Sequence, residues 1–142
     1  MNTVPVLSWA WADWTEPAIY QINDVPLITL VYVGEAKNPA WRLMEQLFGW
    51  SHSELWHKIA PYSEISSWHQ LLQRWTITQV AVVADATKRK AQEDQIIKRL
   101  RPPLNRHHLL ERCQYLENTG ITGLYRTHSE REAFEAQGPH LY

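Results

Sequence analysis

Ala18-Ile19-Tyr20 and, twelve positions after that tyrosine, Tyr32-Val33-Gly34 decide the fold of this chain. Both runs are apolar or β-branched, and Asp24-Val25-Pro26 between them has the composition of a turn. The pattern predicts an antiparallel hairpin of strands 17–23 and 27–34. Such a hairpin brings two phenol hydroxyls to neighbouring positions.

A helix is predicted soon after the second strand. Pro39 suits the first turn of a helix that continues to Phe48 and ends at Gly49. Helical spacing puts Arg42 and Gln46 on one side, facing the same space. We expect the other side to face the core, with Trp41, Met44, Leu47 and Phe48. A guanidinium near two phenol hydroxyls is suited to binding a phosphate.

The rest of the chain predicts further helices and one more strand. Residues 51–75 form an interrupted helical segment, whose second piece carries the apolar stripe Ile65, Trp68, Leu71, Leu72 and Trp75. Residues 76–84 suit the centre of a sheet, and a helix capped by Asp85 or Thr87 then runs toward Arg101. We also expect a helix over 106–117 and a short one near 129–136. Residues 8–14 alternate like an edge strand or a packed arm.

Glu93 stands out in the helix that runs toward Arg101. It shares the spacing i, i+3, i+4, i+7 with Ile96, Ile97 and Leu100, so its carboxylate lies on the apolar stripe. An ionised carboxylate in apolar surroundings needs a cation, a set of donors or a metal ion. A salt bridge to an arginine at the edge of the core is the alternative.

These elements, taken in order, resemble the GIY-YIG nuclease superfamily, especially the catalytic domains of the bacterial excision-repair nuclease and of homing endonucleases. The resemblance covers residues 17–107. Its first motif corresponds to Ala18-Ile19-Tyr20 and its second to Tyr32-Val33-Gly34. The helical arginine of the family falls on Arg42, its metal-binding glutamate on Glu93 and its terminal asparagine on Asn105.

The resemblance implies an α/β (α+β) fold, with a small mixed sheet of about three strands flanked by helices. We expect one domain over 1–142, with the nuclease-like core at 17–107 and a C-terminal helical extension, 108–142, packed on it. The implied activity is a metal-dependent DNA endonuclease of DNA repair or recombination. The implied catalytic residues are Tyr20, Tyr32, Arg42, Glu93 and Asn105, with Glu93 holding Mg²⁺ or Mn²⁺. The residues expected to bind substrate are Gly34, Lys37, Lys88, Arg89, Lys90 and Arg106.

Three positions depart from the family pattern. Gln46 stands where the family often has His or Tyr, and an amide cannot act as a base. Glu35 replaces a lysine that is frequent in excision-repair relatives, and Ala18 replaces a glycine. The alternative function is therefore a catalytically impaired module of this family that binds nucleic acid or protein. An RNA-directed or toxin-like nuclease is a third alternative.

Composition narrows the class of protein. The formal net charge of −1 argues against a general nucleic-acid coat protein, although residues 86–112 carry eight basic and three acidic side chains, a net of +5. One cysteine, Cys113, excludes an internal disulfide, and no apolar stretch is long enough to span a bilayer. We therefore expect a cytoplasmic protein with no membrane partner. The eight tryptophans predict core filling or a dimer contact, with base stacking as the alternative. A homodimer or an accessory specificity protein would select the DNA target.

Overall fold

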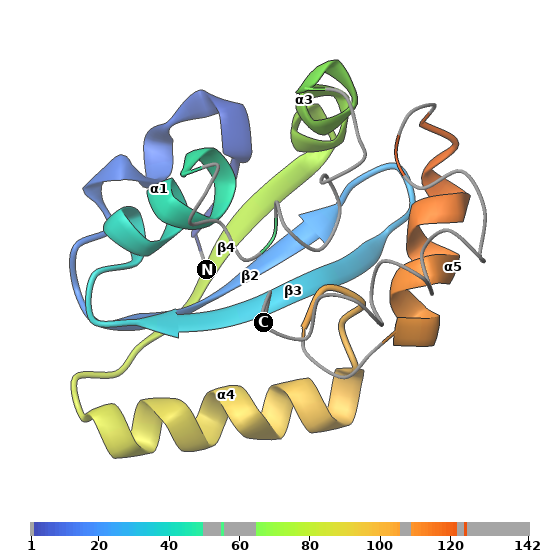
Figure 1. Ribbon diagram of the computed structural model, residues 1–142. Coiled ribbons are helices and arrows are strands. Elements are labelled where there is room, and N and C mark those ends of the chain that lie inside the picture. Colours follow the sequence, from blue (N-terminus) through green and yellow to red (C-terminus); the bar gives the residue numbers. More distant parts are fainter. Residues whose placement is uncertain (1, 50–54, 56–64, 106–108, 122–123, 125–142) are drawn as a thin grey trace.

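The computed structural model describes residues 2–49, 55, 65–105, 109–121 and 124. Within them lie the strands β1 (Asn2–Pro5), β2 (Ala18–Asp24), β3 (Thr29–Ala36) and β4 (Trp75–Val82), and the helices α1 (Pro39–Phe48), α3 (Ile65–Gln73), α4 (Ala86–Leu100) and α5 (Leu109–Thr119). The helices α1 and α3 cover one face of the sheet, α4 covers the other, and α5 lies beside the turn of the β2–β3 hairpin (Figure 1). The predicted α+β class is confirmed.

The sheet has the order β1-β4-β2-β3, and every pairing is antiparallel. Tyr20 lies opposite Gly34, and Ile22 lies opposite Tyr32. Because paired residues point to the same side, both tyrosines share one face of the sheet, while Glu35 points to the other. The expected mixed sheet is wrong, because β2 separates β3 and β4, which run parallel to each other. The fourth strand, β1, comes from the first residues of the chain.

The residues that follow β1 form a packed arm. Two short 3₁₀ helices, η1 (Val6–Ser8) and η2 (Ala10–Asp13), replace the edge strand that was the other interpretation of residues 8–14. Trp11 and Trp14 are buried, and the Trp11 indole donates to the Val6 carbonyl oxygen at 2.7 Å. Core filling therefore explains these two tryptophans.

The bounds predicted for α1 are confirmed, and Leu47 is buried as expected, but the sides expected for Trp41, Met44 and Gln46 are wrong. The Asn38 side chain accepts a hydrogen bond from the Trp41 amide at 3.1 Å, and Pro39 opens the helix. Gln46 is buried, whereas Trp41 is 68 % exposed and Met44 is 40 % exposed. A polar amide takes a core position here because it finds two buried hydrogen-bond partners.

The next two elements follow the sequence pattern closely. Trp68, Leu71 and Leu72 of α3 are buried as expected, but Trp75 belongs to β4 instead of the helix. The earlier helical piece predicted near Ser53 lies outside the described residues, apart from buried Leu55. β4 lies inside the sheet between β1 and β2, as predicted.

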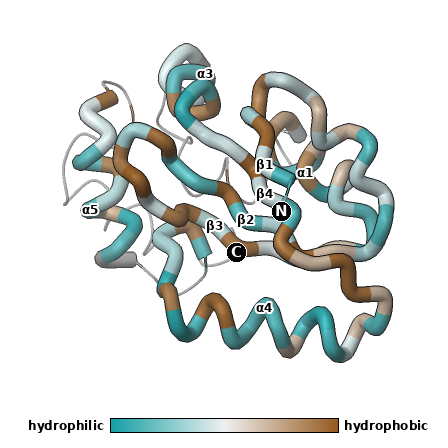
Figure 2. The backbone as a smooth tube through the Cα atoms, turned by 180° about the vertical axis from the view of Figure 1, so that it is seen from behind, coloured by the Kyte–Doolittle hydropathy of each residue, from teal (hydrophilic) through white to brown (hydrophobic). Residues whose placement is uncertain are grey.

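Helix α4 begins at the cap predicted for it and is mostly hydrophilic. The Asp85 carboxylate accepts from the Lys88 amide at 2.9 Å, and the helix ends at Arg101 with φ of 47°. Figure 2 shows hydrophobic residues recurring only at intervals along it. Its attachment to the sheet therefore depends strongly on polar contacts.

The C-terminal part of the chain is described only to residue 121 and at residue 124. Within it α5 packs on the core through buried Cys113, Tyr115 and Leu116. The helix expected near 129–136 lies outside the described residues, as does Arg106. None of the described helices has both the length and the apolar character that a bilayer crossing requires.

Candidate active site

The two predicted tyrosines meet at a glutamine. The Tyr20 hydroxyl donates to Gln46 Oε1 at 2.7 Å, and Gln46 Nε2 donates to the Tyr32 hydroxyl at 2.7 Å. The two phenol rings have centroids 6.3 Å apart. The hairpin thus brings the hydroxyls together as predicted, while the amide that joins them was expected on the other side of α1.

Gly34 is required by the position of Tyr20. A Cβ atom at Gly34 would lie 2.5 Å from both the Cζ and the hydroxyl oxygen of Tyr20. No side chain fits there unless the phenol moves, so Gly34 keeps the path from Tyr20 to Gln46 open. Its predicted contact with substrate stays a prediction.

The tyrosine network is closed to solvent. Tyr20 has no exposed surface, and Tyr32 and Gln46 are also buried. A phosphate therefore reaches the Tyr20 hydroxyl only after the neighbouring side chains move. In this conformation both phenols therefore lie below the protein surface.

Arg42 lies on the same helix at the surface. Its side chain is half-exposed, and Nη1 lies 3.9 Å from Glu45 Oε2, one turn along α1. Such an exposed pair is weak and readily rearranged. Arg42 and Gln46 do not face a common space, because the guanidinium points outward and the amide points into the core.

Glu93 is buried on α4, with an exposed fraction of 7 %. Its Oε1 atom accepts from Lys90 Nζ at 2.6 Å, and Asp94 lies 3.8 Å from the same ammonium. Burial raises the pKa of Glu93, Lys90 opposes the shift, and the nearby charges of Glu35 and Asp94 add to it. The hydrogen bond to Glu93 raises the pKa of Lys90 despite some desolvation. The charged partner that we expected for the Glu93 carboxylate is therefore Lys90.

No group of three or more His, Cys, Asp or Glu side chains gathers to hold a metal in the described parts of the chain. Glu93 therefore offers a divalent cation a single carboxylate ligand, and its predicted metal role stays a prediction. Lys90 occupies the Glu93 oxygen, but its side chain is 60 % exposed and can rotate into solvent.

Glu35 and Arg89 form an ion pair that fixes α4 to the end of β3. Arg89 Nε donates to Glu35 Oε2 at 2.6 Å, and Nη1 donates to the Val83 carbonyl oxygen at 3.0 Å. Arg89 is buried and its donors serve the fold, and its predicted role in binding substrate stays a prediction. The ion pair with Arg89 explains why this chain has an acid, Glu35, at that position.

Asn105 clamps the backbone of β3. Its Oδ1 accepts from the Val33 amide at 3.0 Å, and its Nδ2 donates to the Val33 carbonyl oxygen at 2.9 Å. It holds the residue between Tyr32 and Gly34, and so sets the position of both.

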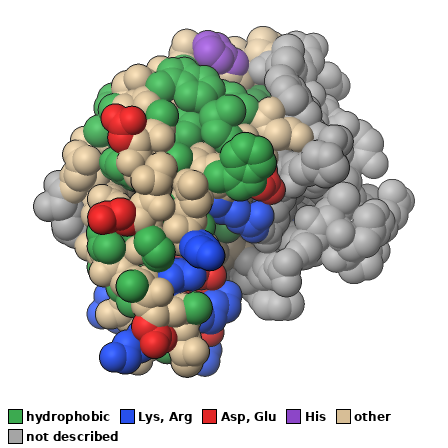
Figure 3. All heavy atoms as spheres, turned by 90° about the vertical axis from the view of Figure 1, so that its left-hand side faces the viewer, with side chains coloured by type: hydrophobic (Ala, Val, Ile, Leu, Met, Phe, Trp, Pro, Cys, Tyr) green, Lys and Arg blue, Asp and Glu red, His purple; other side chains and the backbone are tan. Residues whose placement is uncertain are grey.

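Exposed cations lie at both ends of α4, with Lys98, Arg99 and Arg101 at its C-terminal end. Lys37, Lys88 and Lys90 are exposed at the other end, just before α1 and in the first turns of α4. Figure 3 looks at this end and shows Lys and Arg side chains gathered below a hydrophobic area. The C-terminal ends of β3 and β4 lie at the same end of the sheet (Figure 1). The predicted basic surface is thus present, while the contribution of Arg106 lies outside the described residues.

A second polar network lies at the opposite end of the sheet, and no sequence pattern indicated it. Asp24 is fully buried and accepts from Arg74 Nε at 3.0 Å, Arg74 Nη2 at 3.1 Å and the Tyr115 hydroxyl at 2.8 Å. The Trp75 indole donates to that hydroxyl at 2.7 Å. Its members come from three separate segments, namely β2, residues 74–75 and α5, so no local spacing could reveal it.

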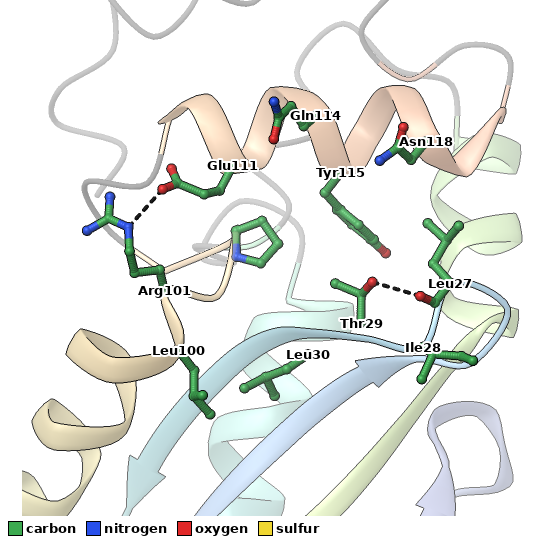
Figure 4. Close-up of a pocket in the computed structure, with 11 residues that line it drawn as sticks. Leu27, Ile28, Thr29, Leu30, Leu100, Arg101, Glu111, Gln114, Tyr115 and Asn118 are labelled. Carbon is green, nitrogen blue, oxygen red and sulfur yellow. Dashed lines mark hydrogen bonds and ion pairs between the residues drawn. The ribbon is translucent and has the colours of Figure 1, made fainter.

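Tyr115 also borders a groove of about 490 Å³ between α5 and the β2–β3 turn (Figure 4). The groove is lined on one side by Leu27, Leu30 and Leu100, and at its rim Arg101 Nε bonds to Glu111 Oε1 at 2.8 Å. Ile28, at the turn, is 93 % exposed and has φ of 50°. The predicted catalytic residues take no part in lining this groove.

Comparison with models of known protein families found no match, and neither curated proteins nor solved structures gave a significant match.

Proposed function

We propose that this protein is a metal-dependent endonuclease that hydrolyses phosphodiester bonds in DNA at the end of the sheet where α1 and α4 begin. The observation that carries the proposal is Glu93: a buried carboxylate, with a pKa raised chiefly by burial, within a basic surface. Perturbed acids of this kind concentrate at functional sites. The outward guanidinium of Arg42 supplies a planar donor for a phosphate.

Each residue has a distinct role in the proposed reaction. Glu93 anchors Mg²⁺ or Mn²⁺ once Lys90 has turned aside. A cation held by Glu93 would supply charge neutralisation at the phosphate and activation of a water molecule. Arg42 donates to the non-bridging oxygens, where charge builds up. Asn105 acts as a positioning residue, because it holds the strand that carries Tyr32 and Gly34.

The two tyrosines are not equivalent. Tyr32 accepts a hydrogen bond from the Gln46 amide nitrogen. Tyr20 instead donates its proton to the oxygen of the same amide. Tyr20 thereby holds Gln46 in place, and both phenols lie on the face of the sheet that α1 covers, whereas Glu93 lies on α4 at the other face, so neither phenol is assigned a part in activating the water.

A nicking assay on supercoiled DNA tests the proposal. Parent protein is compared in Mg²⁺, in Mn²⁺ and with chelator, alongside Glu93→Ala and Arg42→Ala. We expect cutting only with metal, and a loss of about 10²- to 10³-fold in each variant, the usual cost of removing one preorganised group. Asp94→Ala and Arg99→Ala are matched controls, because both side chains are exposed on α4. Equal cutting by parent and Glu93→Ala would remove Glu93 from the mechanism.

The competing proposal is a module of the same design that binds DNA without cutting it. Two observations favour it: Tyr20 has no exposed surface, and Lys90 already neutralises Glu93. It predicts salt-dependent DNA binding that is unchanged by chelator, with no strand cleavage in either metal. Metal-dependent turnover that is lost in Glu93→Ala would exclude it.

A further inference from the structure

The outward side of α1 carries an exposed aromatic stripe, which we define as Trp41, Met44, Phe48 and Trp9. The three helical members are spaced i, i+3, i+7, so they lie along one side of α1. Trp9 continues the line from the N-terminal arm, because its ring stacks on Phe48 with centroids 4.6 Å apart and planes 22° apart. Trp41 is 68 % exposed and Trp9 is 45 % exposed.

Phe48 packs partly against the core, whereas Trp41, Met44 and Trp9 are exposed and leave the core to other residues. Trp11 lies behind Trp9 at 5.2 Å between ring centroids and is itself fully buried. The backbone at Trp9 has φ of 61°, a left-handed conformation that is uncommon outside glycine. This backbone conformation places the Trp9 indole at the surface, stacked on Phe48 and about half exposed to solvent. A contiguous apolar surface that stays exposed to solvent in the folded chain indicates a binding site.

Cations flank the stripe. Lys37 lies one helical turn before Trp41 in sequence, and Arg42 follows it directly, against the acid Glu45. Figure 3 shows the hydrophobic area and the Lys and Arg side chains meeting on one face of the molecule. Exposed indoles beside cations are the usual means of holding single-stranded nucleic acid, because bases stack on the rings while phosphates meet the charges.

The size of the stripe also argues against a second copy of the chain as its occupant. From the exposed fractions of its members, it offers roughly 400 Å² or less, given that a large aromatic side chain presents about 150–250 Å². A stable protein interface needs about 800 Å² from each partner. The faces of one or two bases match the smaller area.

We propose that the aromatic stripe is a stacking platform for unpaired bases, so that the substrate is DNA with a single-stranded segment and not an uninterrupted duplex. The proposal rests on the proposed function in one respect: the strand on the stripe is the one whose phosphate Arg42 contacts. Bases inside a duplex have no free faces for the indoles, whereas a bubble, flap or single strand exposes them.

Binding without cleavage tests this. Fluorescence anisotropy in chelator compares a labelled duplex with a central bubble, its fully paired counterpart and a single strand. We expect tighter binding to the bubble and to the single strand than to the paired duplex. Trp41→Ala should weaken binding to the unpaired DNA by about 5- to 150-fold, the equivalent of roughly 1–3 kcal/mol for one stacked base, and should leave the paired duplex unaffected.

Two control variants sharpen the measurement. Trp41→Phe keeps a ring and should retain most of the affinity, and Ile28→Ala removes an exposed hydrophobic residue at the far turn and should change nothing. Unaltered binding of Trp41→Ala to the bubble overturns the proposal, as does an equal loss on the paired duplex. So does a parent dimer in sedimentation that Trp41→Ala converts to monomer, because the stripe would then join two copies.

The failures of the two proposals are distinguishable. Dependence of bubble binding on Trp41 in a protein that cuts nothing supports the platform and removes the nuclease. Cutting that needs Glu93 but ignores Trp41 overturns the platform and keeps the nuclease. No binding to any DNA overturns both.

Discussion

Two buried acids at opposite ends of the sheet behave differently. Asp24 has no exposed surface and accepts hydrogen bonds from Arg74, the Tyr115 hydroxyl and the Leu27 amide. Glu93 is almost as buried, yet among the described residues its hydrogen bond comes from Lys90, which is itself mostly exposed. A carboxylate with all its neighbours in place supports the fold. A carboxylate such as Glu93, whose partner Lys90 can move into solvent, can still bind another cation.

The largest effect that tests this contrast is expected at Asp24. Asp24→Ala leaves the Arg74 guanidinium and the Tyr115 hydroxyl without their acceptor, and breaking a buried pair on one side costs about 3–5 kcal/mol. Urea unfolding followed by circular dichroism measures the loss. Glu45→Ala, at an exposed pair, is the control and should stay close to the parent. A loss at Asp24 no larger than that of the control would show that the network does not stabilise the fold.

A smaller effect with a distinctive pH dependence is expected at Tyr115. Tyr115→Phe removes the hydroxyl that joins Trp75 to Asp24, at a cost of about 1–3 kcal/mol. Burial raises the pKa of Tyr115 above its usual value near 10. The folded chain thus holds this proton more tightly than the unfolded chain, and stability is full below pH 10 and declines as the pH rises above it.

The measurement is urea unfolding of parent and Tyr115→Phe between pH 8 and about pH 11. The parent should lose stability with rising pH more steeply than the variant. Parallel pH profiles would mean that the Tyr115 proton is not linked to folding.

The smallest effect, and the one of opposite sign, is expected at Glu93. Its pKa is raised in the folded chain, chiefly by burial, so this carboxyl adds stability below its unfolded value near 4.3 and loses that contribution as the pH rises through the folded value. At neutral pH, Glu93→Gln should therefore unfold at a higher urea concentration, with a gain of about 0.5–2 kcal/mol. Activity should be lost at the same time.

Asp94→Asn is the control for that experiment, because the Asp94 side chain is half-exposed on the same helix. Its stability and activity should match those of the parent. A destabilised Glu93→Gln protein would show that Lys90 and Glu93 serve the fold in the way that Asp24 does, and the contrast between the two ends of the sheet would disappear.

The parts of the site that follow from neighbours in sequence were predictable. The placement of Tyr20 and Tyr32 on one face of the sheet follows from alternation in a short hairpin. The spacing of Glu93 with Ile96, Ile97 and Leu100 predicted that its carboxylate is buried, and it is, although Leu100 is 47 % exposed. Partner choice was not predictable, because Lys90, Arg89 and Asn105 each had several chemically suitable partners within reach of the chain.

Local sequence by itself determined where the main elements begin and end. Asn38 with Pro39, and Asp85 before α4, act through hydrogen bonds and dihedral limits inside a single turn, so no distant residue is needed. Tertiary structure alone decided which side of α1 is buried. Gln46 enters the core because two phenols from β2 and β3 satisfy its amide, and Trp41 stays in solvent, since burial depends on partners that only the folded chain brings together.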